Sequence, residues 1–342
     1  MKILGIESSC DETAASIVEG KGDSVKVLSN VVSSQIDLHK KYGGVIPELA
    51  AREHVLSVLP VVETALKNAG IKKSDVATEL NGIAVATGPG LVSSLMVGIE
   101  TAKTLSYVHN VPSISINHIE GHVFANFIEN KNINFPAIIL TVSGGHTMII
   151  LMEDFNKFTT LGETRDDAAG EAFDKAAQLM DMGYPGGPAI SKLAQRAKAA
   201  NNIKLPRPMI NSGDLDFSFS GLKTALLYEL QKDPNYKKRL PEYCLEFQQA
   251  IIDVLIKKTI TASRGHEAKS ILLAGGVSAN IELRTQLDQA IKKNIPGTLF
   301  VKPELSYTTD NAAMIASAGY FKARENTFTP WNKLDVNPTL SI

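Results

Sequence analysis

The chain has 342 residues, with 35 Lys and Arg against 36 Asp and Glu, 44% hydrophobic residues and two cysteines. This composition excludes disordered, collagen-like and disulfide-stapled proteins, and the length fits two domains. A formal net charge of −1 provides no overall attraction to polyanions, so a nucleic-acid partner would need a local basic patch. Cys10 and Cys244 lie far apart in the chain, which favours a reducing compartment and predicts a cytoplasmic protein.

Neither an export signal nor a membrane span is expected. Glu7 and Asp11 fall within the stretch that an export signal would keep apolar. Residues 80–99 lack Asp, Glu, Lys and Arg, but Gly-Pro-Gly at 88–90 interrupts them. A buried strand, a turn and a helix explain this run better than a membrane helix.

In chain order, the first half predicts three strands and then alternating helices and strands. Apolar runs separated by short polar turns indicate an antiparallel meander, and helical spacing of apolar residues begins at Pro47. The expected elements are strands at 3–6, 14–18 and 25–32, a helix at 47–70, a strand at 82–86, a helix at 91–107, a strand at 111–116 and a helix at 119–129.

The second half repeats this order of elements without repeating the residues. The expected elements are strands at 137–142, 147–152 and 158–161, a helix at 167–180, a strand at 270–274, a helix at 279–292, a strand at 298–301 and a helix at 311–322. Two such copies predict two like α/β domains facing a cleft, with the first hairpin turn of each pointing into it. Two unrelated α/β domains are the alternative.

An insertion at 182–239 interrupts the second copy and is basic. It holds ten Lys and Arg against four Asp and Glu. One interpretation is a solvated helical surface. The other is a patch for a phosphate backbone, with Phe217, Phe219 and Tyr236 available for stacking on bases.

A histidine pair predicts half of a metal site. His118 and His122 are four residues apart, which places both imidazoles on one face of a helix. Asp310 is a candidate third ligand, although an Asp before a helix can also serve as its N-cap. This set suits iron(II), zinc or manganese. Glu120 stands two positions after His118 and is poorly aimed at a metal-bound water, which argues against a zinc peptidase.

Two glycine turns and two acidic stretches are further candidates. The turn at 143–145 and the Gly275-Gly276 pair could offer backbone N–H groups to an anion, or could be plain turns. Acidic residues crowd residues 163–174, where helix-start preference explains some and ligand binding could explain Asp174. Asp11 and Glu12 lie in the first hairpin turn, where turn propensity is the simpler explanation for Asp11.

Taken together, these segments resemble the bacterial TsaD (YgjD) family, the transferases that complete threonylcarbamoyladenosine in tRNA. The similarity covers nearly the whole chain. Its motifs are MKILGIESSCDET at 1–13, SQIDLHKKYGGVIPELAAREH at 34–54, TGPGL at 87–91, NHIEGH at 117–122, SGGHT at 143–147, DDAAGEAFDKAA at 166–177, YPGGP at 184–188, FSFSGLKTA at 217–225, LLAGGVSAN at 272–280 and TDNAAMIA at 309–316.

The resemblance implies an α/β fold of two ribonuclease-H-like domains, the actin/hexokinase/heat-shock ATPase superfold. It gives a first domain at 1–131, on which 323–342 would pack back, and a second at 132–322 that carries the insertion. It implies one divalent metal ion, iron(II) first and zinc second, on His118, His122 and Asp310. The implied ligands of threonylcarbamoyl-adenylate are Thr141, Val142, Ser143, Gly144, Gly145, Asp174, Gly187 and Asn280.

The implied reaction is acyl transfer from threonylcarbamoyl-adenylate to the exocyclic amine of the adenosine adjacent to the anticodon, in tRNAs reading codons that begin with A. Asp11 and Glu12 would position the reactants or accept the amine's proton. Implied partners are tRNA, a smaller inactive paralogue (TsaB-like) and a P-loop ATPase (TsaE-like). The alternatives are an ATP-dependent small-molecule kinase of the same superfold and a non-catalytic nucleotide-binding regulator.

Overall fold

A computed structural model describes residues 1–129, 132–200 and 202–342. The chain forms two compact units. Unit 1 comprises Met1–Ile133 and Pro303–Ile342, and unit 2 comprises Asn134–Lys302. The boundary expected after residue 131 borders residues 130–131, which lie outside the described residues, as does residue 201 of the insertion. In the part of the chain that is described, no helix has both the length and the apolar content that crossing a membrane requires.

Unit 1 is built on a five-stranded sheet of order β3-β2-β1-β4-β5. Its strands are β1 (Lys2–Glu7), β2 (Glu12–Lys21), β3 (Ser24–Ser34), β4 (Gly82–Gly88) and β5 (Ser113–Asn117). The first three form the expected antiparallel meander, and β4 and β5 continue the sheet parallel to β1. Every residue of β4 is buried, because helices cover both faces of a central strand here.

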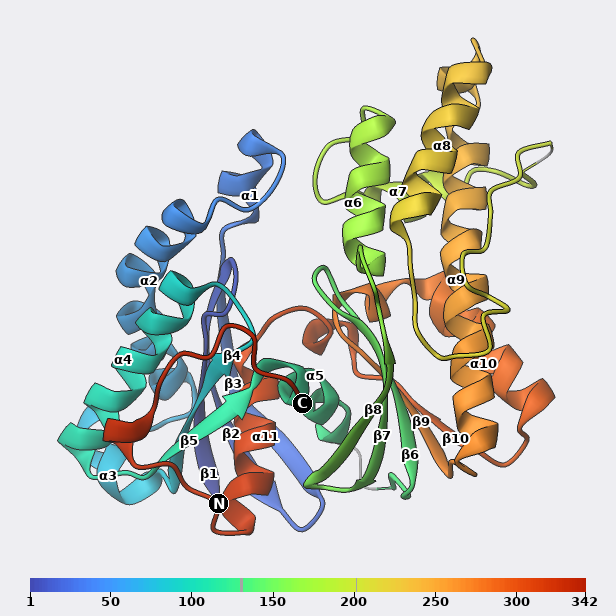
Figure 1. The fold of residues 1–342 in the computed structure, drawn as a ribbon. Coiled ribbons are helices and arrows are strands. Elements are labelled where there is room, and N and C mark those ends of the chain that lie inside the picture. Colours follow the sequence, from blue (N-terminus) through green and yellow to red (C-terminus); the bar gives the residue numbers. More distant parts are fainter. Residues whose placement is uncertain (130–131, 201) are drawn as a thin grey trace. The chain divides into compact units, whose positions relative to one another are not determined.

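The helices of unit 1 are α1 (Ile36–His39), α2 (Pro47–Asn68), α3 (Val76–Glu79), α4 (Val92–His109), α5 (His118–Phe124) and α11 (Ala312–Arg324). Helices α2 and α4 cover one face of the sheet, while α5 and α11 cover the other (Figure 1). Pro47 occupies the first turn of α2, where its missing N–H costs nothing. Asn110 ends α4 in the left-handed conformation.

Small residues let α11 lie directly on the sheet. A Cβ at Gly5 of β1 would overlap the carbonyl oxygen of Ala312, and a Cβ at Gly319 would overlap the side chain of Ala84 on β4. The sequence had placed residues 303–322 in the second domain, but this packing groups α11 with unit 1. The close approach also fixes the position of Asp310, two residues before α11 begins.

Unit 2 contains a second five-stranded sheet, of order β10-β9-β6-β7-β8. Its strands are β6 (Ala137–Val142), β7 (Thr147–Asp154), β8 (Lys157–Glu163), β9 (Ser270–Ala274) and β10 (Leu299–Val301). β6, β7 and β8 form an antiparallel meander, and β9 and β10 run parallel to β6. This repeats the strand order and directions of unit 1, as the repeated element order predicts.

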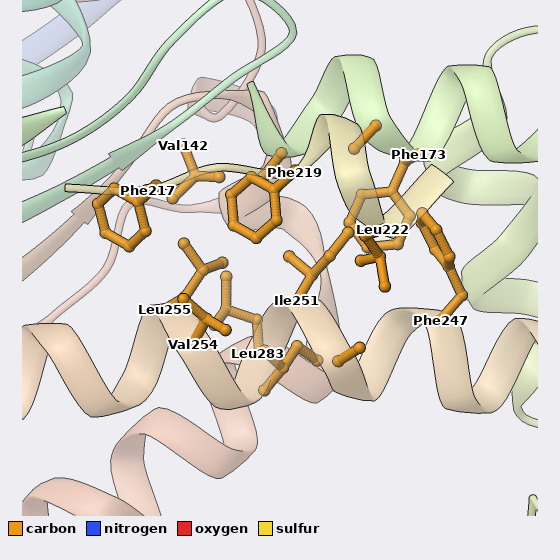
Figure 2. Close-up of a cluster of buried hydrophobic side chains, with 14 of the residues drawn as sticks. Val142, Phe173, Phe217, Phe219, Leu222, Phe247, Ile251, Val254, Leu255 and Leu283 are labelled. Atoms are coloured by element: carbon orange, nitrogen blue, oxygen red, sulfur yellow. The ribbon is translucent and has the colours of Figure 1, made fainter. Parts of the chain in front are cut away.

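The helices of unit 2 are α6 (Ala169–Leu179), α7 (Gly186–Ala194), α8 (Ser220–Lys232), α9 (Leu240–Gly265) and α10 (Ile281–Asn294). Figure 2 shows the core beside α9, where Phe247 and Ile251 point toward Phe173 of α6 and Leu222 of α8. The rings of Phe173 and Phe247 have centroids 5.8 Å apart.

Two aromatic residues of the insertion do not have the role proposed from the sequence. Phe217 and Phe219 were candidates for stacking on bases, but both are fully buried in the core of unit 2. Their rings stack on each other with centroids 6.2 Å apart. Tyr236 is partly buried and packs against the same core. The stacking role is therefore wrong for both phenylalanines.

Candidate functional site

Two histidines and an aspartate of unit 1 converge. Helix α5 begins directly after β5, and the side chain of Asn117 caps its N-terminus. His118 is the first residue of α5, and His122 lies about one turn further along the helix. Asp310 Oδ1 lies 3.2 Å from His122 Nε2 and 3.6 Å from His118 Nε2. One ligand atom from each of the three residues lies within 4.8 Å of the others. The structure therefore brings a possible metal-binding group together from segments far apart in the sequence.

The donor set fits a transition-metal ion. His122 is 1% exposed; its Nε2 faces the Asp310 carboxylate at 3.2 Å, and its Nδ1 has no hydrogen-bond partner among the described residues. A buried polar nitrogen is costly to leave unsatisfied. Two imidazoles and a carboxylate are typical ligands of iron and zinc, and such a set leaves positions open for oxygens of a substrate.

Contacts in the structure also decide between the alternative roles considered for Asp310 and Glu120. The side chain of Asn311, not Asp310, caps α11 by accepting the N–H of Met314 at 3.2 Å. Glu120 forms an ion pair with Lys322 of α11 at 2.7 Å. Glu120, which lies between the two histidines, is therefore paired with a residue of α11, in agreement with the argument against a zinc peptidase.

The electrostatics of the cluster favour positive charge. Burial disfavours the charged imidazolium of His118, but the carboxylates of Asp310 and Glu7 outweigh that effect and raise its pKa to about 9. For Glu12, burial and the nearby carboxylates of Asp310 and Asp11 favour the uncharged form and raise its pKa to about 10. A surplus of carboxylates around a buried point is what a bound cation would compensate.

Asp11 lies in the turn between β1 and β2, as the sequence predicts, whereas Glu12 is the first residue of β2 and pairs with Ser34 of β3. Glu12 accepts a hydrogen bond from Ser34 Oγ at 3.1 Å, and Asp11 is 7% exposed. The buried His54 of α2 anchors this turn, with Nδ1 2.7 Å from Thr13 Oγ1 and Nε2 2.9 Å from the carbonyl oxygen of Cys10. Sequence reasoning did not identify this anchor, because its partners are 41 and 44 residues away.

In unit 2, the two glycines of the turn after β6 border open space. Ser143 donates its N–H to the carbonyl oxygen of His146 at 2.8 Å, and Ser143 Oγ accepts the N–H of His146 at 3.1 Å. A Cβ atom at Gly144 or Gly145 would have no neighbouring atom within 4 Å. Thr141 and Val142, at the end of β6, are buried.

The remaining predicted ligand residues shape the loops of unit 2. Asp174 Oδ1 accepts the N–H of Gly186 at 2.7 Å, and Asp174 also accepts the N–H of Gly187. Burial raises the pKa of Asp174, and these backbone donors oppose the rise. Asn280 caps α10 by accepting the N–H of Leu283 at 3.1 Å. Its amide nitrogen donates to Ser191 Oγ and Gln248 Oε1 at 3.1 and 2.9 Å.

The acidic stretch before α6 is compensated within unit 2. Lys175 lies 2.6 Å from Asp167 and 2.9 Å from Glu171. Asp166 accepts hydrogen bonds from Phe219 N and Ser220 N at 2.8 and 3.2 Å, so it caps the start of α8 from outside the helix. These contacts explain the charges of Asp166, Asp167 and Glu171 without a ligand.

The repeated mixed sheets define an α/β protein of the actin/hexokinase/heat-shock ATPase superfold. Solved structures of HypF share the fold: the T. kodakarensis protein aligns with a TM-score of 0.66 at 12% identity, over 96% of this chain and 49% of its own. A full-length HypF with bound phosphate and nucleotide gives a TM-score of 0.62 at 12% identity, over 96% of this chain and 56% of its own. This chain therefore spans about half the length of those proteins.

Residues 26–317 match the family described as TsaD, tRNA N6-adenosine threonylcarbamoyltransferase. The protein of that name in Dehalococcoides mccartyi is 48% identical to this chain, over 100% of this chain and 99% of its own length. The one in Desulfitobacterium hafniense is 45% identical, over 100% of this chain and 98% of its own length. The protein of that name in Listeria innocua is 48% identical over 99% of this chain and 96% of its own. The chain belongs to the TsaD family. The resemblance noted in the sequence is thereby confirmed.

Proposed function

We propose that this chain transfers a threonylcarbamoyl group from threonylcarbamoyl-adenylate to the exocyclic amine of the adenosine adjacent to the anticodon, in tRNAs reading codons that begin with A. The observation that carries the proposal is 45–48% identity, over nearly full length, to proteins named tRNA N6-adenosine threonylcarbamoyltransferase. These relatives favour an acyltransferase over the kinase and the regulator.

The chemistry needs positioning more than a nucleophilic side chain. The amine nitrogen forms a bond to the carbamoyl carbon, the bond from that carbon to the adenylate phosphate oxygen breaks, AMP leaves, and the amine loses a proton. Because the donor is already activated, no serine or cysteine nucleophile is needed. The protein's task is to align donor and acceptor and to stabilise developing charge.

We assign the adenylate to the loops of unit 2 formed by residues 141–145, Asp174, Gly187 and Asn280. The N–H of Ser143 is committed to His146, so Gly144 and Gly145 are the proposed donors to negative charge in this turn. Asp174 and Asn280 hold the neighbouring helix starts through the hydrogen bonds described above, which supports a role in shaping these loops.

We assign one divalent cation to His118, His122 and Asp310, with iron(II) as the first candidate and zinc as the second. The convergence of the three residues, with both Nε2 atoms facing the Asp310 carboxylate, supports this assignment. When bound, such an ion supplies Lewis-acid polarisation of an oxygen and a fixed orientation. Metal analysis of the purified protein, with His118→Ala as the comparison, tests it.

We propose that Asp11 and Glu12 orient the reactants and that one of them accepts the proton lost by the amine. Asp11 is buried and Glu12 is half-buried, and the carboxylates of Asp310 and Asp11 both act on Glu12, which supports this role. Turnover should fall in the variant carrying Asp11→Ala and Glu12→Ala while binding of the adenylate, measured by calorimetry, persists. Unchanged turnover with intact binding would exclude the role.

The basic insertion is the proposed tRNA surface. Lys192 in the last turn of α7 and the nearby Arg196 and Lys198 are all exposed. Reversing these three charges should weaken tRNA binding and leave adenylate binding unchanged. The matched control reverses Lys21, Lys26 and Lys72, which are exposed on unit 1, and changes the net charge equally. Equal tRNA affinity of the two variants would exclude the insertion as a specific surface.

A cytoplasmic location and two partners, a smaller TsaB-like paralogue and a TsaE-like P-loop ATPase, complete the proposal. The two widely separated cysteines support the location, and the family resemblance supports the partners. The decisive experiment supplies purified protein with threonylcarbamoyl-adenylate and unmodified tRNA, with and without the partners. Formation of the modified nucleoside, measured by nucleoside mass spectrometry, is the expected result. If no condition yields it while both substrates bind, the proposed function fails.

A further inference from the structure

Glu7 is a fully buried carboxylate at the end of β1, and each of its two side-chain oxygens faces a nitrogen at hydrogen-bond distance. It has 0% exposure, and Oε1 accepts the N–H of Ser9. Oε2 lies 3.1 Å from Nδ1 of His118. Ionised carboxylates are rarely buried without such partners, because desolvation is costly. Glu7 therefore makes a specific contact with a predicted metal ligand.

The contact selects one tautomer of the neutral His118 ring. An ionised carboxylate only accepts hydrogen bonds, so Nδ1 must carry the hydrogen that it donates to Glu7. In the neutral imidazole, the lone pair then lies on Nε2. That nitrogen faces Asp310, 3.6 Å away, and so belongs to the cluster. A metal ion needs this lone pair.

Ser9 cannot make the same selection. Its Oγ also lies 3.1 Å from Nδ1 of His118, but a hydroxyl can donate or accept and so is compatible with either tautomer. Among the described residues, His122 has no hydrogen-bond partner at Nδ1 that corresponds to Glu7. The orienting carboxylate thus acts on one ring of the pair.

We propose that Glu7 is a positioning residue of the metal centre, which holds the His118 ring so that Nε2 presents its lone pair to a divalent cation. This inference rests on the proposed metal role of His118, His122 and Asp310. Carboxylates that orient metal-bound imidazoles in this way raise metal affinity, and their loss typically weakens it about 10–100-fold.

Glu7→Gln is the most informative variant because it preserves size. Ser9 N–H and His118 Nδ1–H are two donors that require two acceptors, whereas glutamine offers one acceptor and one donor group. If the amide nitrogen faces Nδ1, the ring hydrogen must move to Nε2, where it blocks the cation. If the amide nitrogen faces Ser9 instead, its N–H groups point at the backbone N–H of Ser9, and that N–H loses its acceptor. Ser9→Ala, which keeps the carboxylate, is the matched control.

The experiment titrates the metal-free full-length protein with zinc and with cobalt(II) in competition with a chromophoric chelator. Glu7→Gln should bind about 10–100-fold more weakly than wild type and alter the visible cobalt(II) spectrum, while Ser9→Ala stays within about threefold. Glu7→Asp keeps two acceptors with a shorter reach and should fall between wild type and Glu7→Gln. Circular dichroism of the metal-free forms verifies the fold.

The outcomes separate this inference from the proposed metal site. If wild type binds no stoichiometric metal, or if His122→Ala binds as wild type does, the metal site itself fails and the role of Glu7 fails with it. If His122→Ala loses the metal while Glu7→Gln retains wild-type affinity and spectrum, the metal site stands and the role of Glu7 is overturned. Should Glu7→Gln not fold, wild-type affinity in Glu7→Asp overturns the role instead.

Discussion

Asp166 is expected to stabilise the start of α8 from a distance. Its carboxylate accepts hydrogen bonds from the backbone of Phe219 and Ser220 and from the hydroxyls of Ser218 and Ser220. An N-cap contributes about 0.5–2 kcal/mol, and a negative charge at a helix N-terminus about 0.3–1 kcal/mol. Asp166→Ala should therefore destabilise this helix start by about 1–3 kcal/mol. Asp166→Asn, which keeps one accepting oxygen, should lose about half as much.

Hydrogen exchange measures this effect locally. The amide protons of Phe219 and Ser220 should lose about 5–150-fold of their protection in Asp166→Ala, the ratio that corresponds to 1–3 kcal/mol. Glu163→Ala removes an exposed charge of the same sign from the same acidic stretch and should leave those amides unchanged. Wild-type protection at both amides in Asp166→Ala would refute the capping argument.

The same contact predicts a pH dependence. Burial tends to raise the pKa of Asp166, but its hydrogen bonds from Ser218, Phe219 and Ser220 prevail and hold it below the usual value. A lowered pKa in the folded state means that the stabilisation is present above the unfolded pKa, near 4, and is lost as the pH falls through the folded pKa. The difference between wild type and Asp166→Ala should accordingly shrink in acid, toward the value for Asp166→Asn, because a protonated carboxyl still has an accepting oxygen.

Further substitutions test the metal cluster and the packing. His122→Ala should abolish stoichiometric iron or zinc binding, measured by elemental analysis, and full retention would contradict the metal assignment. Gly5→Ala should cost about 1–3 kcal/mol in urea unfolding, because the methyl group overlaps the Ala312 carbonyl, whereas Gly144→Ala should cost under about 0.5 kcal/mol. Phe247→Ala in the unit 2 core should cost about 3–5 kcal/mol, and a loss under about 1 kcal/mol would contradict its close packing.

Local patterns were sufficient to predict most of the strands and their order along the chain. Strands such as β6, with a continuous apolar run, and turns such as 143–145 are short-range features that a sequence displays directly. Helix α9 was not predicted, because burial on much of its surface weakens the helical alternation of polar and apolar residues. The four-residue helices α1 and α3 are too short to show a period.

The site was less accessible from sequence. The four-residue spacing of His118 and His122 is a local signal, but Asp310 joins them only through the packing of α11 on β1. The roles of Glu7 and Asp166 depend on partners 111 and 52 to 54 residues away. Nothing in their immediate neighbours distinguishes them from other acids, so these contacts required the fold.

The chain leaves unit 1 at Ile133 and returns to it at Pro303, with all of unit 2 in between. During synthesis from the N-terminus, the ribosome makes His118 and His122 before unit 2 and Asp310 after it. The cluster can therefore be completed only after unit 2 has been synthesised. A nascent chain that stalls or is cut before Asp310 retains both histidines but lacks the carboxylate that completes the group.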